Sequence, residues 1–524
     1  MDTKALRQKI LDLAIRGKLV PQNPNDEPAS VLLERIRQQK QQMVKEGKLK
    51  PKDIKNDSVI FVGEDNLHYE KFADGSVKCI EDEIPFELPE SWAWARLQSF
   101  VNFIGGSQPP KSTFEYVATK DNIRLIQIRD YKTDKFLTYI PKSLARRFCS
   151  KGDVMIGRYG PPIFQVLRGL EGSYNVALMK AVSEPGIMLN DYLFYLLQDG
   201  ELLKMLESLS DRTCGQDGIN MYELNRYIVG IPPLDEQNRI TQYLISVLPI
   251  VDNIASNKAE LESLITQTKA KILDLAIRGQ FVPQDPNDEP ASVLLERIRA
   301  EKEELIKQGK IKRDKKKSVI FRGEDNSYYL NDGTSTIDIS QEVPFDIPDS
   351  WYWGKLKDIV MINPRNKLDD NTDVAFIPMP LIEDGYSGHH TSEIRKWKEV
   401  KTGFTHFQEG DVGVAKITPC FENRKSVIFE NLNNGYGAGT TELYVFRPYG
   451  KTILPQYLLA YMKSAQFIEN GKRTFAGVVG QQRVSKEYVE NVYFPIPPID
   501  EQKRIVHQLT IAFEYLNLIS NALT

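Results

Sequence analysis

The chain has 524 residues, so more than one hydrophobic core and at least two domains are expected. Apolar residues make up 41% and charged residues 27%, which is ordinary for a globular protein. No stretch approaches the roughly 18 uninterrupted apolar residues of a membrane span, and the first residues carry no secretory pattern. The cysteines are scattered without a CxxC pair, which argues against a disulfide framework or an all-cysteine zinc site. We therefore expect a cytoplasmic protein that contacts no membrane.

The net charge of −3 argues against a generic polyanion binder, but the charge is distributed unevenly. Residues 92–230 hold 17 Lys and Arg against 14 Asp and Glu, and residues 351–495 hold 18 against 16. The remainder of the chain is acidic. Two mildly basic blocks in an acidic framework indicate two modules that face a polyanion.

A long internal repeat organises the chain. KILDLAIRGKLVPQNPNDEPASVLLERIR (9–37) returns at 271–299 with 26 of 29 positions identical. SVIFVGEDN (58–66) returns as SVIFRGEDN (318–326), and IPPLDEQNRI (231–240) as IPPIDEQKRI (496–505). The stretches 95–230 and 354–495 match only faintly. One fold is thus used twice, with a nearly identical frame and two different surfaces.

The first elements of each copy read as helices followed by a hairpin. Residues 4–17 place Leu6, Ile10 and Leu13 at helical spacing, and residues 29–46, with their copy 291–308, form a second helix. SVIF is typical of a short strand, and the Asp-Gly turns in FADGSV and LNDGTST predict a small hairpin in each copy. The tryptophans at equivalent positions (Trp92, Trp94, Trp351, Trp353) are expected to pack where the frame meets each basic block.

The first basic block contains side chains suited to DNA. Arg pairs bidentately with guanine and Gln or Asn with adenine, whereas Lys, Ser and Thr hold phosphates. On a predicted strand, Gln127 and Arg129 would share one face and Arg124 would take the other. Loops and strand ends supply the rest, and the candidates are Lys111, Arg124, Gln127, Arg129, Arg158, Tyr159, Gln216 and Asn220.

The central helix begins near Asp235 and carries a 4-3 heptad pattern. Its apolar positions are Ile240, Leu244, Val247, Val251, Ile254, Leu261, Ile265, Ile272 and Leu275. Residues 500–524 match its first half and residues 4–17 its second half. The repeat is therefore circularly permuted, which predicts two long antiparallel helical rods about a pseudo-two-fold axis.

The second basic block again gathers polar and basic side chains in loops. Its candidates for DNA contact are Lys416, Thr418, Arg424, Thr441, Gln481, Gln482 and Arg483. We assign base contact to the GQQRV loop, because amide and guanidinium groups stand together there, and phosphate or groove contact to Lys416.

Motifs of catalysis are missing from the sequence. There is no GxxxxGK[ST], no HExxH, no NPPY-type tetrapeptide and no FxGxG cofactor loop. His389 and His390 are adjacent, so their side chains point apart on regular structure and predict no metal site. We expect no catalytic residue, no metal ligand and no cofactor.

Together these motifs resemble the specificity subunit of Type I restriction–modification systems. The carriers are LAIRGKLVPQNPNDEPASVLLERI and its copy, the two IPPxDEQxRI segments, ELPESWAW and DIPDSWYW, GDVMIGRYG, AKITPCFEN and GVVGQQRVSK. The resemblance implies two target-recognition domains that each read half of a split double-stranded DNA sequence, on paired helices that act as a spacer. It also implies two methyltransferase subunits, which bind S-adenosylmethionine and methylate adenine, and restriction subunits as partners.

The predicted fold is therefore α+β, with two α/β target-recognition domains joined by the helical rods. The predicted parts are a helical and hairpin region (1–91), a first recognition domain (92–234), a central helical and hairpin region (235–350), a second recognition domain (351–499) and a last helix (500–524). A stand-alone DNA-binding regulator is the alternative, and it would not need partner-docking helices. A fused methyltransferase lacks its motifs here, and a purely helical scaffold does not explain the two divergent domains.

Overall fold

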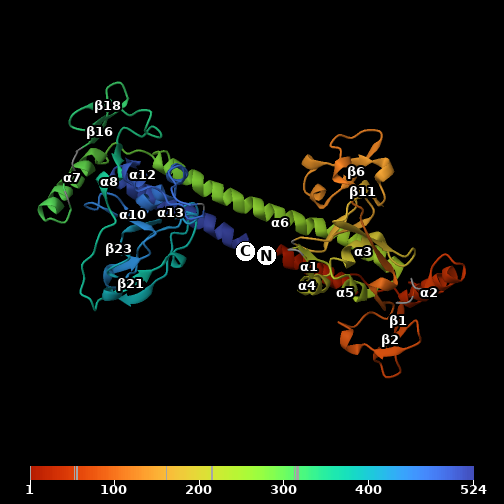
Figure 1. Cartoon of the computed structure of the whole chain (residues 1–524). Coiled ribbons are helices and arrows are strands. Elements are labelled where there is room, and N and C mark those ends of the chain that lie inside the picture. Colours follow the sequence, from red (N-terminus) through yellow and green to blue (C-terminus); the bar gives the residue numbers. More distant parts are fainter. Residues whose placement is uncertain are drawn as a thin grey trace. The chain divides into compact units, whose positions relative to one another are not determined.

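The computed structural model describes residues 2–51, 54, 57–160, 162–209, 211–213, 216–311, 313, 318–478 and 480–523. The chain divides into two compact units, Met1–Asn257 and Lys258–Thr524. Helix α6 (Leu234–Ile277) is continuous and contributes its first half to one unit and its second half to the other (Figure 1). Each unit therefore has its own core and is described separately.

The first unit begins with two helices and a three-stranded hairpin sheet, followed by the first basic block. Besides the first half of α6, its helices are α1 (Thr3–Ile15), α2 (Ala29–Lys45), α3 (Asn190–Leu196), α4 (Gly200–Ser208) and α5 (Met221–Arg226). Its strands are β1 (Ser58–Val62), β2 (His68–Phe72), β3 (Val77–Cys79), β4 (Ala93–Arg96), β5 (Val101–Gly105), β6 (Asn122–Ile126), β7 (Tyr139–Pro141), β8 (Phe148–Cys149), β9 (Val154–Gly157), β10 (Gln165–Arg168), β11 (Gly172–Tyr174), β12 (Leu178–Ser183), β13 (Asp211–Thr213), β14 (Gln216–Gly218) and β15 (Ile228–Ile231).

The second unit repeats this succession and ends in the long helix α13. Its helices are α7 (Ala291–Lys307), α8 (Leu356–Ile359), α9 (Trp397–Val400), α10 (Pro455–Lys463), α11 (Ala465–Lys472), α12 (Lys486–Asn491) and α13 (Ile499–Leu523). Its strands are β16 (Val319–Arg322), β17 (Tyr328–Asn331), β18 (Thr336–Asp338), β19 (Tyr352–Lys355), β20 (Val360–Ile362), β21 (Asp373–Ile377), β22 (Glu393–Lys396), β23 (Thr405–Gln408), β24 (Val412–Ala415), β25 (Ser426–Ile428), β26 (Tyr436–Gly439), β27 (Leu443–Pro448) and β28 (Tyr493–Ile496).

The two divergent blocks have the same topology. In the first unit, one four-stranded sheet has the order β10-β9-β12-β5 and the other β7-β6-β11-β8. In the second unit the orders are β20-β27-β24-β25 and β22-β21-β26-β23. Read from β5 to β10, the first sheet of the first unit matches β20-β27-β24-β25 strand for strand, and β7-β6-β11-β8 matches β22-β21-β26-β23. Even the parallel pairs correspond, since β11 runs parallel to β6 as β26 does to β21. The prediction of one fold used twice, α+β in class, is confirmed.

Short two-stranded ladders connect each recognition block to its frame. Strand β4 pairs with β15, and β19 pairs with β28, so the entry and the exit of each block lie side by side. Trp351 and Trp353 flank and enter the β19 ladder and are at most 3% exposed. Trp92 and Trp94 are also buried, at 6% each. The predicted packing of all four tryptophans at this junction is confirmed.

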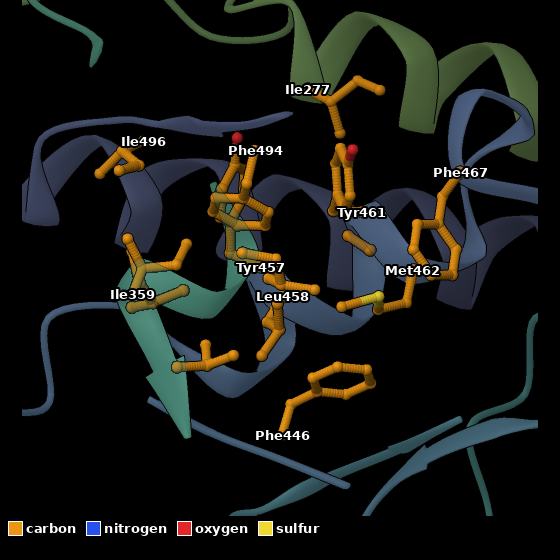
Figure 2. Packing of buried hydrophobic residues seen from close by; sticks show 14 of the residues in the cluster. Ile277, Ile359, Phe446, Tyr457, Leu458, Tyr461, Met462, Phe467, Phe494 and Ile496 are labelled. Carbon is orange, nitrogen blue, oxygen red and sulfur yellow. The ribbon is translucent and has the colours of Figure 1, made fainter. Parts of the chain in front are cut away.

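The core of the second unit lies where helices α10 and α13 meet this ladder. Figure 2 shows Tyr457, Tyr461 and Phe494 packed together with Ile277 of α6 above them. The ring centres of Tyr461 and Phe494 are 4.8 Å apart, with the ring planes at 66°. The core contains residues of the frame helices and of the recognition block, so it fixes the frame helix to the block.

The predicted heptad stripe of α6 is wrong in part. Leu248 and Leu273 are buried although the stripe assigned their neighbours Val247 and Ile272 to the core. Ile254 and Leu261 are each 37% exposed. In each unit the buried side chains of this helix pack in one cluster with the terminal helix and the recognition block, rather than in a regular two-stranded seam.

The predicted stripe of the N-terminal helix differs in the same way. Leu11, Ala14 and Ile15 are buried, whereas Leu6 is 36% exposed. Helix α1 lies against the first half of α6, where Arg7 pairs with Asp252 at 3.0 Å. The expected contact of this terminal helix with the central helix is confirmed within the first unit.

Helix α13 lies against the second half of α6 in the same manner. Lys269 Nζ donates to Asn517 Oδ1 at 2.6 Å and lies 5.7 Å from the ring centre of Phe513. This confirms the expected contact of the second terminal helix. The two-fold relation of the rods remains a prediction.

A buried polar connection at the start of α6 joins frame and recognition block in the first unit. Gln237 is fully buried, donates to the carbonyls of Ile187 and Pro232, and accepts from Leu189 N at 2.9 Å. Two residues further along α6, Arg239 pairs with Asp26 of the NDEP segment at 2.7 Å. Buried amides with satisfied hydrogen bonds fix one geometry, because any other packing leaves polar groups unpaired.

The start of α13 repeats this connection in the second unit. Gln502 is fully buried, donates to Thr452 O and Pro497 O at 3.1 Å each, and accepts from Leu454 N at 2.9 Å. Arg504 pairs with Asp288 at 2.5 Å. The repeated sequence DEQxR therefore has a physical basis: its Gln and Arg each connect the helix to a different loop.

Each hairpin sheet is attached to its unit by different chemistry. In the first unit Arg96 binds Glu70 at 2.7 Å, and both side chains are at least 96% buried. Burial alone would raise the pKa of Glu70, but hydrogen bonds from Arg96 and Ser58 outweigh it and hold the pKa below its ordinary value. The equivalent residues of the second unit are Lys355 and Leu330; Leu330 packs against the hydrophobic core, and Lys355 lies 5.9 Å from the ring centre of Tyr493.

We predict that Gln502→Leu destabilises the second unit by about 2–4 kcal/mol, because three buried backbone groups lose their partner. Urea unfolding measures the change. Lys503→Leu is the matched control on the exposed side of the same turn and should change stability by less than about 0.5 kcal/mol. Equal effects of the two substitutions would contradict the role assigned to the buried amide.

We predict that Arg96→Leu costs about 3–5 kcal/mol at pH 7, since it leaves the Glu70 carboxylate buried and unpaired. The pKa of Glu70 is depressed in the folded protein, so the ion pair stabilises above the unfolded pKa and its contribution is lost as pH falls. The defect should therefore shrink below about pH 4. The double variant Glu70→Leu/Arg96→Lys, which copies the second unit, should be much milder; hydrogen exchange of the β1–β2 amides reports both.

Candidate nucleic-acid interface

In both units a basic residue follows the same buried strand of the recognition block. Arg158 follows β9, and Lys416 follows β24. The next residue forms an isolated bridge to a second loop, Tyr159 to Gly218 and Ile417 to Arg483. The fold thus places two loops, distant in sequence, beside each other at one edge of the sheet in each unit.

In the second unit these loops gather most of the predicted residues. Thr418 N donates to Gln482 O at 2.9 Å, and Gln482 N donates to Thr418 Oγ1 at 3.1 Å. Val484 N donates to the carbonyl of Lys416 at 2.9 Å. These contacts bring together the AKITP and GQQRV segments, which the sequence analysis gave as separate candidates for DNA contact. Gln481 is exposed in the GQQRV loop, and Thr441 is exposed in the turn between β26 and β27, where Lys416 N donates to Glu442 O at 2.9 Å.

Glu442 is the residue of this surface that the sequence analysis missed. Arg483 Nη2 donates to Glu442 Oε1 at 2.7 Å and Arg483 Nε to Glu442 Oε2 at 2.9 Å, which is a two-pronged ion pair. The hydrogen bonds from Arg483, and the charges of Arg483 and Lys416, lower the pKa of Glu442. The same contact raises the pKa of Arg483. Its only sequence signal was its place beside Thr441.

The ion pair limits what Arg483 does without DNA. Its Nη1 also donates to the carbonyl of Gln481 at 3.0 Å, so the loop and Glu442 together orient the guanidinium group. These bonds use Nε–H and one N–H of each terminal nitrogen, so a second N–H on Nη1 and on Nη2 remains for another partner. The Lys416 ammonium lies 5.5 Å from the ring centre of Tyr444, and its charge contributes to lowering the pKa of Glu442.

In the first unit the predicted strand is present and carries Arg124, but it is shorter than expected. Strand β6 ends at Ile126, and Arg129 lies in a short 3₁₀ turn, Ile128–Tyr131. Alternation along a strand therefore does not place Gln127 and Arg129. Both nevertheless donate to Thr138 Oγ1, at 3.0 and 3.1 Å.

Arg124 belongs to the same group of side chains through Asp130. Its guanidinium pairs with Asp130 at 3.3 Å and with Asp134 at 3.4 Å. The Asp130 side chain is 1% exposed, and burial raises its pKa against the opposing charge of Arg124. Arg124 is thus held by carboxylates, and its orientation depends on a buried acid that the sequence analysis did not single out.

Arg158 and Tyr159 stack at the strand end, with the guanidinium carbon 5.3 Å from the ring centre. Arg158 also donates weakly to Val176 O at 3.4 Å, and Tyr159 is 38% exposed. Lys111 is exposed in the turn Lys111–Thr113. These three residues keep charged or aromatic groups available at the surface of the first unit.

Two predicted residues have structural roles. Asn220 caps α5, where its side chain accepts from Tyr222 N and Glu223 N. Arg424 donates to the carbonyl of Lys463 at 3.1 Å and lies over Tyr386, away from the GQQRV loop. Gln216 lies in β14, but its side chain is outside the described residues, as are Cys214 and Gly215. The assignment of Asn220 and Arg424 to DNA contact is not favoured by this geometry.

Exposed aromatic residues near Arg129 were also missed. Tyr116 is 72% exposed and Phe136 58%, and both line one shallow depression together with Arg129 and Lys135. The interleaving of aromatic and basic residues in this region was the available signal. Among the residues that the structure describes, no cluster of His, Cys, Asp and Glu could hold a metal ion, and no helix is long and apolar enough to cross a membrane.

Comparison with known families identifies the class of the domain in the second unit. The family model for the Type I restriction modification DNA specificity domain matches residues 348–523, which contain the two-sheet block of the second unit and α13. This region is therefore such a domain, and the matching strand orders make the first unit a second copy of its fold. The resemblance to Type I specificity subunits found in the sequence is confirmed.

Several proteins named as specificity subunits are similar in sequence to part of this chain. The Type I restriction enzyme EcoAI specificity subunit of Escherichia coli is 47% identical over 257 residues, and the EcoEI subunit is 47% identical over 243 residues. These matches cover 49% and 46% of this chain and 40% and 38% of the relatives, so the chain spans about two fifths of their length. The EcoBI subunit is 20% identical over 86% of the chain.

A solved structure of the HsdS subunit from Thermoanaerobacter tengcongensis is 17% identical, with a TM-score of 0.41 over 84% of this chain and 94% of that one. A chain from a structure of a type I R-M system is 16% identical, with a TM-score of 0.49 over the same shares of the two chains.

We predict that Arg483→Ala or Gln482→Ala weakens specific DNA binding by roughly tenfold to a hundredfold and relaxes recognition in one half-site only, because a bidentate base contact is lost. Lys416→Ala is the contrasting variant: it should weaken all sequences more evenly and flatten the salt dependence, since a phosphate contact releases counterions. Binding titrations at several salt concentrations and methylome sequencing of cells with each variant measure this. A change in the half-site read by the first unit would contradict the assignment.

Proposed function

We propose that the chain is the DNA-specificity subunit of a Type I restriction–modification complex and reads an asymmetric, bipartite DNA target. The observation that carries the proposal is the repetition of one two-sheet fold with different side chains at the same place. At the bridged loops the first unit has Arg158 and Gly218, and the second has Lys416 and Arg483. A fold kept constant with altered surface groups is suited to reading two different sequences.

Asymmetry of the target follows from this difference. Two identical domains would read two identical half-sites, as symmetric dimers do on palindromes. Here the aromatic and basic depression around Arg129 belongs to the first unit, and the Arg483–Glu442 pair belongs to the second. Each half-site is therefore expected to have its own sequence, with an unread spacer between them.

The residues proposed to contact DNA fall into two groups. Lys111, Arg124, Gln127, Arg129, Arg158, Tyr159 and Gln216 serve the first half-site, and Lys416, Thr418, Thr441, Gln481, Gln482 and Arg483 serve the second. Guanidinium and amide groups would read bases, and Lys416 and the threonines would hold phosphates. We also propose the domain limits 92–234 and 351–499 for the two recognition domains.

The partners are proposed from the family. The relatives are named as specificity subunits of Type I restriction enzymes, which implies two methyltransferase subunits and restriction subunits in the complex. We propose that the chain itself is not catalytic, because the sequence contains none of the catalytic motifs searched for and its candidate residues are suited to DNA recognition. The helical frame, repeated almost unchanged, suits a contact with two copies of one partner.

We predict that the purified chain binds DNA but transfers no methyl group and cuts no DNA. Adding its methyltransferase subunits should give adenine methylation at a split target, measured as tritium transfer from S-adenosylmethionine. Tritium transfer by the isolated chain would refute the non-catalytic assignment. Tight binding to an operator-like site with no response to the methyltransferase would favour the alternative of a stand-alone regulator.

A further inference from the structure

The hairpin sheet of each unit has one buried face and one outward face. In the first unit Ile60 and Glu70 point inward, where Ile60 packs against Trp94. Successive residues of a strand alternate between the faces, so Val59, Phe61 and Tyr69 point outward. In the second unit Ile320 is buried at 7% exposure, and its neighbours Val319 and Phe321 are 40% and 38% exposed. We call these outward surfaces the hairpin faces.

Each hairpin face carries the same aromatic arrangement. Phe61 stacks on Tyr69 with ring centres 5.9 Å apart and planes at 28°, and Phe321 stacks on Tyr329 at 5.7 Å and 26°. Tyr69 donates to Asp65 and Tyr329 to Asp325, each at 2.7 Å. Phe61 is 40% exposed although it belongs to a pre-oriented aromatic pair. A rigid exposed aromatic pair is typical of an interaction surface.

The pattern of change within the chain separates this surface from those that read DNA. SVIFVGEDN and SVIFRGEDN agree at eight of nine positions, whereas the bridged loops of the recognition blocks differ in sequence. Away from the aromatic pair the faces do vary, since Val77 and Lys71 correspond to Thr336 and Asn331. The shared feature is thus the outward Val–Phe–Tyr group, which is Val59, Phe61 and Tyr69 in the first unit and its copy in the second. The same group on both hairpins is suited to binding the same occupant.

The charge around the hairpin faces indicates what that occupant is. Residues 58–83 contain seven Asp and Glu against two Lys, one of the acids being the inward Glu70, and the equivalent residues 318–342 contain five against one Arg. Several of these acids are exposed beside the aromatic pair, among them Glu64 and Glu324. An acidic rim repels the DNA backbone and attracts basic protein side chains.

We propose that the two hairpin faces are docking surfaces for two copies of one protein chain, which presents an apolar patch with a basic rim to each. This inference rests on the proposed function, in which that protein is the methyltransferase subunit. The aromatic pair provides the buried centre of each contact, and Glu64 and Glu324 belong to its rim. One hairpin in each unit then accounts for a stoichiometry of two.

The test measures binding of the cognate methyltransferase subunit to the full chain by native mass spectrometry and by titration. Phe61→Ser and Phe321→Ser should each weaken one of the two binding events on the order of tenfold or more, and the double variant should lose both at concentrations that saturate the unaltered chain. Glu64→Lys and Glu324→Lys, which leave the aromatic pair in place, should weaken the same events by repelling the basic rim.

Val77→Thr is the matched control, because it copies the second unit on the same face and should leave binding unchanged. DNA binding by each variant in isolation should also be unchanged, which verifies folding. If the unaltered chain binds two subunits and the double variant binds them equally well, this inference is overturned while the proposed function stands. If the unaltered chain binds none, the proposed function fails as well. Self-association of the chain that the substitutions abolish would instead make the faces a contact between copies.

Discussion

The fully buried glutamine at the start of each frame helix is the contact on which the rest of the structure depends. Gln237 and Gln502 each satisfy three backbone groups from the loop before the helix and from the recognition block. A buried amide tolerates no alternative packing, because unpaired polar groups in a core cost about 1–3 kcal/mol each. The neighbouring Arg–Asp ion pair fixes the same helix to the NDEP turn. Frame and recognition block are therefore held in one relation within each unit.

This connection explains why the frame stays nearly identical while the recognition blocks diverge. The frame helix binds the recognition block through its Gln and the NDEP turn through its Arg, so a change on one side leaves a polar group unpaired on the other. The outward loops of the recognition blocks carry no such restriction. Residues at the bridged loops can change, as from Gly218 to Arg483, while the bridge itself remains. Specificity can thus vary on a constant scaffold.

The electrostatics of the recognition surfaces follow a common principle. Arg124 and Arg483 are both paired with acids, Arg124 with Asp130 and Arg483 with Glu442. These acids orient the guanidinium groups and reduce the net positive charge of the surface. If these surfaces contact DNA as proposed, the fixed orientation penalises contacts of the wrong geometry and favours specific over non-specific binding. The overall charge of −3 is consistent with such a surface.

The sequence by itself determined the repeat, its permutation, and the helix and hairpin positions. Repetition and periodicity are one-dimensional, so they are readable without a structure. Only the tertiary structure decided which face of α1 and α6 is buried, because the recognition block competes with any helix–helix seam for the apolar side chains. It alone showed that Asn220 caps a helix and that Arg424 binds a distant carbonyl. Glu442 and Asp130 acquire their roles from residues that are remote or differently oriented in space, and no sequence pattern encodes such a pairing.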